Sequence, residues 1–381
     1  MKTLLRKLIF LSVATAVQAW VMTSRPLTSS RFLSSARDAK TVNEDETTTP
    51  QLVQRTFYRF SPGSEVDVHN SVVLEDRYIQ SKDQKHRTLL LRDGNVEDGE
   101  IGDAFFTISP TTTFSTSEIV MALYLASNPA LCTEDLLEVS SETGLASILG
   151  ILGAGFVSRR DDPTSAPEEE DDILTIATKR NKLVPKSLET VTLTAAEERY
   201  LPVLMKNSQH AGIPSCTVEP LDWKVRHARG RPPKEVTTIV AVDLALTYPE
   251  AVALARTCAY RLRPSWVGRE NAKTIPRFVH VCPADREDVA YLQRELTNGY
   301  KMTAYTSYLK LEQIIFCPQT VSSSVADEDE DMELEVQDIR SLTFTSLIAQ
   351  HHPDYVGGGS GELFFPADTG ATGFREAESS W

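Results

Sequence analysis

A chain of 381 residues with 41% hydrophobic residues is long enough for one large α/β domain with extensions. Its formal net charge of −14 argues against a general nucleic-acid-binding protein, because phosphates repel an acidic surface. Two acidic runs, 168–172 and 327–335, carry much of this charge and are typical of solvated loops. The cysteines stand singly without a CxxC motif, so we expect reduced, mostly buried thiols. They are Cys132, Cys216, Cys258, Cys282 and Cys317.

Residues 1–19 have the pattern of a cleavable signal peptide. Lys2, Arg6 and Lys7 precede an apolar run over Leu8–Val17, which is too short to cross a bilayer and ends near Ala19.

Residues 20–50 read as a transit peptide and a linker. The stretch 22–40 is rich in Ser, Thr and Arg, and Asp38 is its only acid. With Trp20 after the cleavage point, the tandem resembles the bipartite presequence of algae with complex plastids. We therefore expect import into a plastid, removal of residues 1 to about 40, and no membrane segment in the mature protein. The alternative is a secretory signal followed by a polar linker, which the lack of a disulfide pattern disfavours.

The next segment, 51–106, has short strand patterns at 55–60, 71–74 and 88–92, and predicts a small antiparallel β cap. Ser115 and Glu118 then form a capping box, so a helix is expected to follow over 119–125.

From residue 136 on, strand and helix patterns alternate, which predicts a doubly wound, mostly parallel sheet. The first central strand is expected at 136–139, flanked by the strands at 190–193 and 237–243. Antiparallel pairing is expected only at 309–316 and in the cap. Further strands are predicted at 216–221 and 277–281, and helices at about 145–156, 196–211, 250–262 and 286–298. The polar stretch 159–186 reads as an insertion, and 319–381 as an acidic linker and tail.

Five segments in order resemble the seven-β-strand (class I) protein-lysine methyltransferases, which use S-adenosylmethionine (AdoMet). They are the entry helix at 114–125, the first nucleotide motif at 136–145, the second strand and its helix at 191–207, Leu221-Asp-Trp223, and the fourth strand and its edge at 240–250. The resemblance spans roughly 105–317 and assigns a methyltransferase-like domain to 107–318. It implies an AdoMet-dependent protein N-methyltransferase, with lysine as the acceptor and a protein as the partner.

The resemblance places the methionine part of AdoMet beside the first motif. Glu138 corresponds to the family's acid near the methionine amino group. The turn normally carries glycines so that its backbone can approach the ligand closely. Here Ser140 replaces the first glycine and Glu142 the second, and Gly144 remains. We expect Glu142 to repel the AdoMet carboxylate.

The same resemblance assigns the nucleoside contacts. Ala195 stands where an acid normally binds the ribose hydroxyls. Glu197 or Glu198 could replace that acid, but both are expected inside a helix, which is the wrong place for a bidentate contact. Asp222 corresponds to the acceptor for the adenine amino group and Trp223 to the ring that lines adenine.

Asp243 is the candidate catalytic residue, because it matches the acid of the family's Asp-x-x-Tyr edge. The Tyr position holds Leu246, and Tyr248 lies two residues further on. Together with the altered turn this predicts weak AdoMet binding. It leaves open a second interpretation, a pseudoenzyme that keeps the fold and binds a protein. Ordinary turn capping and core packing also explain acids and aromatic rings at such positions.

Two other patterns in the sequence resemble binding motifs only weakly. The histidines have no metal-ligand spacing, so no metal site is expected. Residues 229–234, Arg-Gly-Arg-Pro-Pro-Lys, resemble the core of an AT-hook but fall where the family carries a variable loop, so we expect no nucleic-acid partner.

Overall fold

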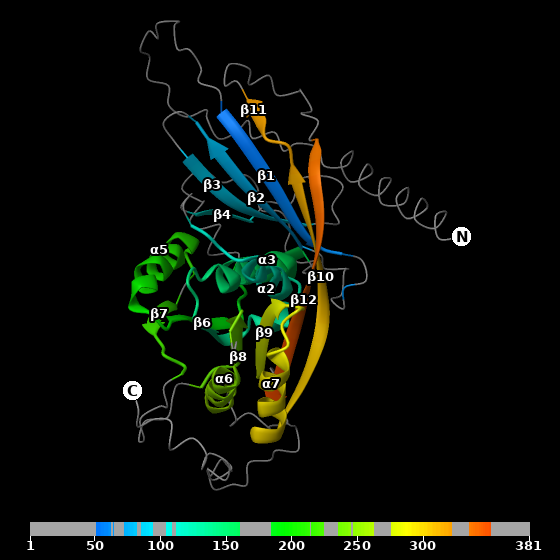
Figure 1. Cartoon of the computed structure of the whole chain (residues 1–381). Coiled ribbons are helices and arrows are strands. Elements are labelled where there is room, and N and C mark those ends of the chain that lie inside the picture. The colour runs from blue at the N-terminus through cyan, green and yellow to red at the C-terminus, as the bar shows by residue number, and fades with distance from the viewer. Residues whose placement is uncertain are drawn as a thin grey trace, which may run out of the picture. The chain divides into compact units, whose positions relative to one another are not determined.

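The structure is a computed structural model of the chain (Figure 1). It describes residues 51–61, 64, 72–81, 85–93, 104–108, 112–160, 184–213, 215–224, 235–244, 247–262, 276–321 and 335–351. The expected presequence, most of the insertion, the segment 229–234 and the end of the tail lie outside these residues. The chain divides into two units, which are described separately.

The first unit comprises 1–59, 69–112 and 312–341. Its strands are β1 (Gln51–Phe60), β2 (Val72–Gln80), β3 (Lys85–Asp93), β4 (Ala104–Ile108) and β11 (Gln319–Val321). They pair antiparallel in the order β4-β3-β2-β1, and β11 also pairs with β1. A small core holds the sheet together, with Phe57, Val73, Ile314 and Phe316 buried and the rings of Phe57 and Phe316 edge to face at 5.1 Å. The expected antiparallel cap is confirmed.

The second unit comprises 60–68, 113–311 and 342–381. Its sheet has the order β10-β12-β9-β8-β5-β6-β7. The strands are β5 (Glu134–Val139), β6 (Leu188–Ala195), β7 (Cys216–Pro220), β8 (Thr238–Val242), β9 (Arg277–Pro283), β10 (Met302–Phe316) and β12 (Val336–His351). Residues 312–316 of β10 and 336–341 of β12 are counted with the first unit. β5 to β9 are joined by parallel pairings, and β5 lies between β6 and β8, as predicted. The doubly wound, mostly parallel seven-stranded sheet is therefore confirmed.

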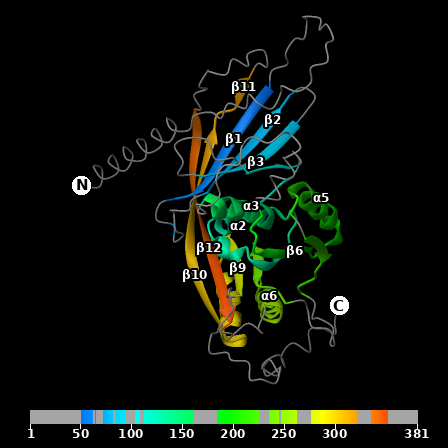
Figure 2. The ribbon, with the colours of Figure 1, turned by 180° about the vertical axis from the view of Figure 1, so that it is seen from behind.

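Helices connect and cover these strands. They are α2 (Thr116–Ala126), α3 (Leu145–Arg160), α5 (Leu201–Ala211), α6 (Tyr248–Arg261) and α7 (Val289–Arg294). α2 lies beside α3, and both views of the ribbon show this pair (Figures 1 and 2). α6 and α7 pack on the sheet, since Leu254 and Leu292 share a buried cluster with Leu137 and Ile239. None of the helices in the described part of the chain is long and apolar enough to cross a membrane.

The main departure from expectation is β12. The stretch 319–381 was expected to be an acidic linker and tail, yet 336–351 forms a strand that pairs antiparallel with β9. It, rather than the segment 309–316, is the antiparallel strand beside β9. Its buried run includes Thr345 and Ser346, and these polar residues conceal the strand pattern in the sequence.

Candidate functional site

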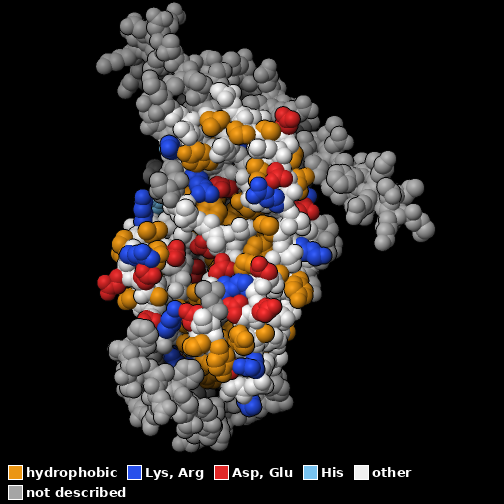
Figure 3. Space-filling model, in the orientation of Figure 1, with side chains coloured by type: hydrophobic (Ala, Val, Ile, Leu, Met, Phe, Trp, Pro, Cys, Tyr) orange, Lys and Arg blue, Asp and Glu red, His pale blue; other side chains and the backbone are white. Residues whose placement is uncertain are grey.

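A pocket of about 360 Å³ opens at the carboxyl ends of β5, β6 and β8, next to the beginning of α2. This is the sheet edge at which open α/β sheets bind ligands. Figure 3 shows several acidic side chains near the middle of the face, with basic side chains among them. The pocket is lined by Thr113, Phe114, Ser115, Glu118, Glu138, Val139, Ser140, Ser141, Glu142, Ala196, Glu197, Tyr200, Val242, Asp243 and Leu244.

The turn after β5 has a strained backbone at Ser140, a residue that carries a Cβ. Ser140 has a positive φ of 56°, a region that side chains with a Cβ rarely adopt. The turn is tied to β6, because the Ser140 amide donates to Thr194 Oγ1 at 3.2 Å and the Ser141 amide to the Thr194 carbonyl at 2.7 Å. Such strain persists only where its surroundings impose it, and it concentrates at functional sites.

Ser140→Gly is expected to raise the free energy of unfolding by about 0.5–1 kcal/mol, because glycine adopts a positive φ without a Cβ clash. Urea unfolding of this variant beside Ser140→Ala, which removes only the hydroxyl, is the measurement. A glycine variant less stable than the alanine variant would contradict the strain at this position.

Gly144 ends the turn and does not line the pocket. Its φ is 72°, and an added Cβ would lie 2.9 Å from Leu193 Cδ1 and 3.2 Å from Leu204 Cδ2. Its amide donates to Ser141 Oγ at 2.7 Å. This glycine therefore allows α3 to pack closely on β6 and α5.

We expect Gly144→Ala to lower the free energy of unfolding by about 2–4 kcal/mol, since crowding adds to the cost of a positive φ. The control is Gly212→Ala at an exposed position with a φ of 64°, where an added Cβ has the cost of a positive φ without the crowding of a buried site. Denaturant midpoints give both values, and equal losses would show that crowding at Gly144 is relieved.

Two carboxyls lie on the inner side of the pocket. Glu138, at the end of β5, is buried and accepts from the Ser147 amide at 3.1 Å, and burial raises its pKa. Glu118, in the first turn of α2, accepts from the Ser115 amide at 2.8 Å and from the Thr143 hydroxyl. Burial raises the pKa of Glu118 to about 7, against the effect of these hydrogen bonds and with the help of the charges of Glu138 and Glu142.

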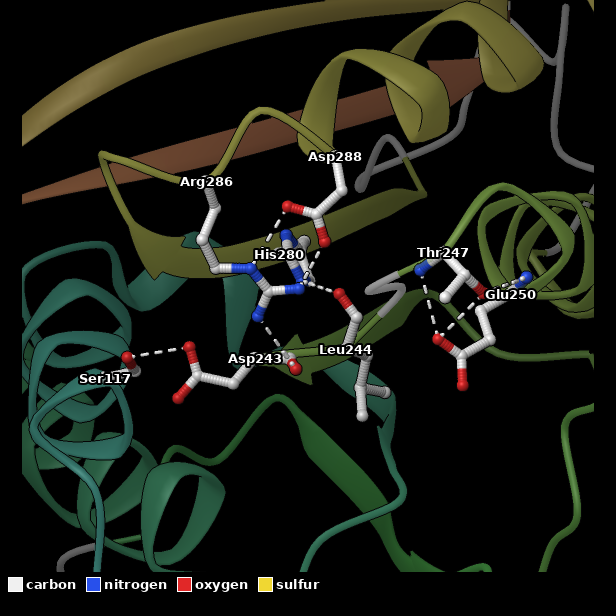
Figure 4. Close-up of polar contacts among 8 residues, drawn as sticks. All are labelled: Ser117, Asp243, Leu244, Thr247, Glu250, His280, Arg286 and Asp288. Carbon is white, nitrogen blue, oxygen red and sulfur yellow. Dashed lines mark hydrogen bonds and ion pairs between the residues drawn. The ribbon is translucent and has the colours of Figure 1, made fainter.

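Asp243 follows β8 with a φ of 53°, and three contacts hold it. Its amide donates to the Val281 carbonyl at 3.0 Å. Its Oδ1 accepts from Ser117 Oγ at 2.9 Å, and its carbonyl accepts from Arg286 at 3.1 Å (Figure 4). Burial raises the pKa of the carboxyl, although Ser117 and the charge of Arg286 act in the opposite direction.

The segment after Asp243 is fixed from β9. The buried ring of His280 has its pKa lowered by burial to about 4, so it is neutral and its Nε2–H donates to the Leu244 carbonyl at 3.1 Å. Arg286 also donates through Nε to Asp288 Oδ1 at 3.1 Å (Figure 4). These contacts fix the backbone at the pocket edge.

The segment after β6 differs from expectation. Glu197 is extended, with φ −109° and ψ 128°, and it lines the pocket instead of lying inside a helix. A short 3₁₀ turn, Glu198–Tyr200, separates it from α5. A hydrogen bond with Glu142 raises the pKa of the Tyr200 hydroxyl. Glu142 and Tyr200 thereby join the segments that follow β5 and β6.

The structure brings together only some of the residues assigned from the sequence. Glu138, Ser140, Glu142 and Asp243 line the pocket, whereas Ala195 is buried at the end of β6 and does not.

Neither residue of the Asp222-Trp223 pair lines the pocket. Asp222 is exposed and accepts from the Lys224 amide at 3.0 Å. Trp223 is 2% exposed within the core, and its Nε1 has no hydrogen-bond partner among the described residues. Tyr248 also lies outside the lining, and its hydroxyl donates to Glu295 at 3.0 Å. Leu246 is not among the described residues.

Sequence reasoning missed five polar residues of the pocket, which are Thr113, Ser115, Glu118, Ser141 and Tyr200. The capping box before α2 identified Glu118 as a helix-start residue but gave no sign that its carboxyl also faces the pocket. Among the described residues, no group of three or more His, Cys, Asp or Glu side chains is placed to hold a metal ion.

No model of a known protein family and no curated protein matches the chain. Part of it is similar to P. horikoshii TYW2 in complex with MeSAdo, with 10% identity, a TM-score of 0.35, and coverage of 70% of this chain and 72% of that one. Precorrin-6y C5,15-methyltransferase from Geobacter metallireducens is 10% identical, with a TM-score of 0.33 and coverage of 65% of this chain and 93% of that one. TrmN from Thermus thermophilus is 12% identical, with a TM-score of 0.33 and coverage of 66% of this chain and 57% of that one.

The strand order and its antiparallel β12 define the class: the second unit has the seven-strand, Rossmann-like fold of AdoMet-dependent methyltransferases. Similarities at such low identity and TM-score add nothing on the substrate. The three names mention no protein substrate.

Proposed function

We propose that the second unit is an AdoMet-dependent methyltransferase that modifies an amine of a protein, with lysine as the acceptor. The observation that carries this proposal is Asp243. Its carboxyl lies at the edge of the pocket on a backbone with positive φ, and contacts with α2, β9 and Arg286 fix its position. Methyl transfer depends mainly on positioning, and a fixed carboxylate at this edge suits a cationic lysine side chain.

The acids of the pocket suit the amino group and the ribose hydroxyls of AdoMet, whereas Glu142 does not suit its carboxylate. The pocket volume of about 360 Å³ lies within the range of small-molecule sites. Glu138 offers a carboxyl to the amino group, and Glu197 offers one to the ribose hydroxyls. When bound, AdoMet supplies an electrophilic methyl group. Glu118, with a pKa of about 7, is suited to accept the proton that a lysine ammonium loses before it attacks.

The test is incubation of the full-length protein with methyl-labelled AdoMet and a protein extract freed of small molecules, followed by amino-acid analysis for N-methyl-lysine. Asp243→Ala is expected to lower the labelling by about 100-fold or more, because a positioning contact is lost. The control is Glu189→Gln, an exposed position at the beginning of β6 that does not line the pocket and should keep full activity. Label recovered only outside lysine would contradict the acceptor assignment.

The altered turn favours a second candidate, a pseudoenzyme that binds a protein without catalysis. Glu142 replaces a glycine and lines the pocket, so it opposes the AdoMet carboxylate. Calorimetry separates the candidates: a folded protein that binds neither AdoMet nor S-adenosylhomocysteine (AdoHcy) supports the pseudoenzyme.

We also propose import into a plastid, with protein rather than nucleic acid as partner. The support is the tandem of signal and transit patterns over residues 1–40 and the net charge of −14. N-terminal sequencing of the protein from its source cell should find a start near residue 40, and a fluorescent fusion should localise to plastids. A mature chain that begins at Met1 would refute processing.

A further inference from the structure

The ionisable Asp, Glu, Lys and Arg side chains among the described lining residues of the pocket are all acidic. Five of its lining residues are acids, and among the described lining residues none is Lys or Arg. They are Glu118, Glu138, Glu142, Glu197 and Asp243. The basic groups nearest to them are already paired with acids. Arg199 contacts Glu197 at 2.8 Å with both side chains largely exposed, and Arg286 is bound to Asp288. Burial raises the pKa of Glu118 to about 7 and also raises that of Glu138, so these two acids contribute less than full charges near neutral pH. Because the described lining has no basic side chain, a ligand that enters the pocket still meets a negative potential.

The turn after β5 also has few amide groups to offer an anion. A helix N-terminus normally attracts anionic groups through its free N–H donors. Here the Ser147 amide, near the beginning of α3, donates to the Glu138 carboxyl instead. The amides of Ser140, Gly144 and Leu145 donate to hydroxyl oxygens of the protein itself. The carboxylate of a bound amino acid would find these donors engaged and Glu142 beside it.

We infer that the pocket selects its ligand by positive charge, binding a sulfonium nucleoside more tightly than the neutral thioether nucleoside that remains after transfer, with Glu142 setting much of the difference. This inference rests on the proposed function. AdoMet carries a net charge of about +1 and AdoHcy about 0 from their ordinary group pKa values. Loss of the sulfonium charge weakens attraction to the acids and promotes release of the product.

Glu142 is the most informative acid. It is exposed, it lines the pocket, and its contact with Tyr200 holds it between the segments after β5 and β6. Because it is exposed, Glu142→Gln should leave the fold intact while it removes one charge from the pocket. The matched control is Glu198→Gln, an exposed position on the same 3₁₀ turn as Tyr200 that does not line the pocket.

The test is calorimetry of the full-length protein with four ligands: AdoMet, AdoHcy, decarboxylated AdoMet and 5′-methylthioadenosine. We expect AdoMet to bind about tenfold or more tighter than AdoHcy, and decarboxylated AdoMet, with one more net positive charge, to bind tighter still. Glu142→Gln should reduce the ratio of the AdoMet affinity to the AdoHcy affinity by about fivefold, and Glu198→Gln should leave this ratio unchanged. Higher ionic strength should weaken AdoMet binding and spare 5′-methylthioadenosine, which is neutral.

The outcomes separate the two proposals. If the nucleosides bind but AdoMet and AdoHcy have equal affinity, or if AdoHcy binds tighter, charge selection is refuted and the proposed function stands. An unchanged ratio in Glu142→Gln refutes the role of that residue. If none of the four ligands binds, the cofactor site itself is refuted, and the inference fails with it.

Discussion

Glu75→Gln is expected to lower the free energy of unfolding of the first unit by about 3–5 kcal/mol, the typical cost of breaking a buried ion pair. The Glu75 carboxylate is fully buried on β2 and contacts three arginines, one on each of the strands β1, β2 and β3. The distances are 3.7 Å to Arg55, 3.0 Å to Arg77 and 2.8 Å to Arg92. Glutamine has nearly the same shape, so the change leaves three half-buried guanidinium groups without their shared carboxylate.

Urea unfolding followed by circular dichroism measures the effect, with Glu312→Gln as the control. Glu312 pairs with Arg59 at 2.7 Å, and each side chain is 24% exposed, so solvent screens the pair. The control should lose less than about 1 kcal/mol. Equal losses in the two variants would mean that the Glu75 cluster contributes no more than a surface pair.

The sequence predicted the sheet of the second unit well, because its strand and helix patterns alternate and are separated by turn residues. The run Leu136–Val139 is short, apolar except for Glu138, and followed by a turn, and it forms part of the central strand β5. The strand β12 was missed because its buried face includes Thr345 and Ser346 and because an acidic run precedes it. A hydroxyl residue that a sheet buries cannot be distinguished in sequence from one that a loop exposes.

The site was predicted less completely, because the resemblance assigns positions but not side-chain directions. Glu142 and Asp243 were found because they lie within three residues of a strand end. Glu118 lies 20 positions before Glu138 and reaches the pocket only because α2 packs beside α3. Trp223 was expected beside the ligand, yet its ring packs into the core. Such choices are made by tertiary packing, which local patterns do not encode.

The stability of the second unit is expected to fall as pH rises from about 4.5 to about 7, through Glu118. Burial raises the pKa of this carboxyl from 4.5 to about 7 in the folded state. A group whose folded pKa lies above its unfolded pKa contributes stability that is complete below the unfolded pKa and is lost as pH rises through the folded pKa. At 1.36 kcal/mol per pKa unit, the loss is about 3 kcal/mol between pH 4 and pH 8.

The measurement is the difference in unfolding free energy between the native chain and Glu118→Gln at several pH values. Glutamine can still accept from the Ser115 amide and the Thr143 hydroxyl, so the cap of α2 is kept. His280, with its pKa lowered to about 4, acts in the opposite sense, losing stability as pH falls below about 6.5, but it is present in both proteins and cancels in the difference. We expect the native chain to lose about 3 kcal/mol relative to the variant from pH 4 to pH 8. A difference that does not change with pH would show that Glu118 titrates normally, and it would remove the proton acceptor from the proposed reaction.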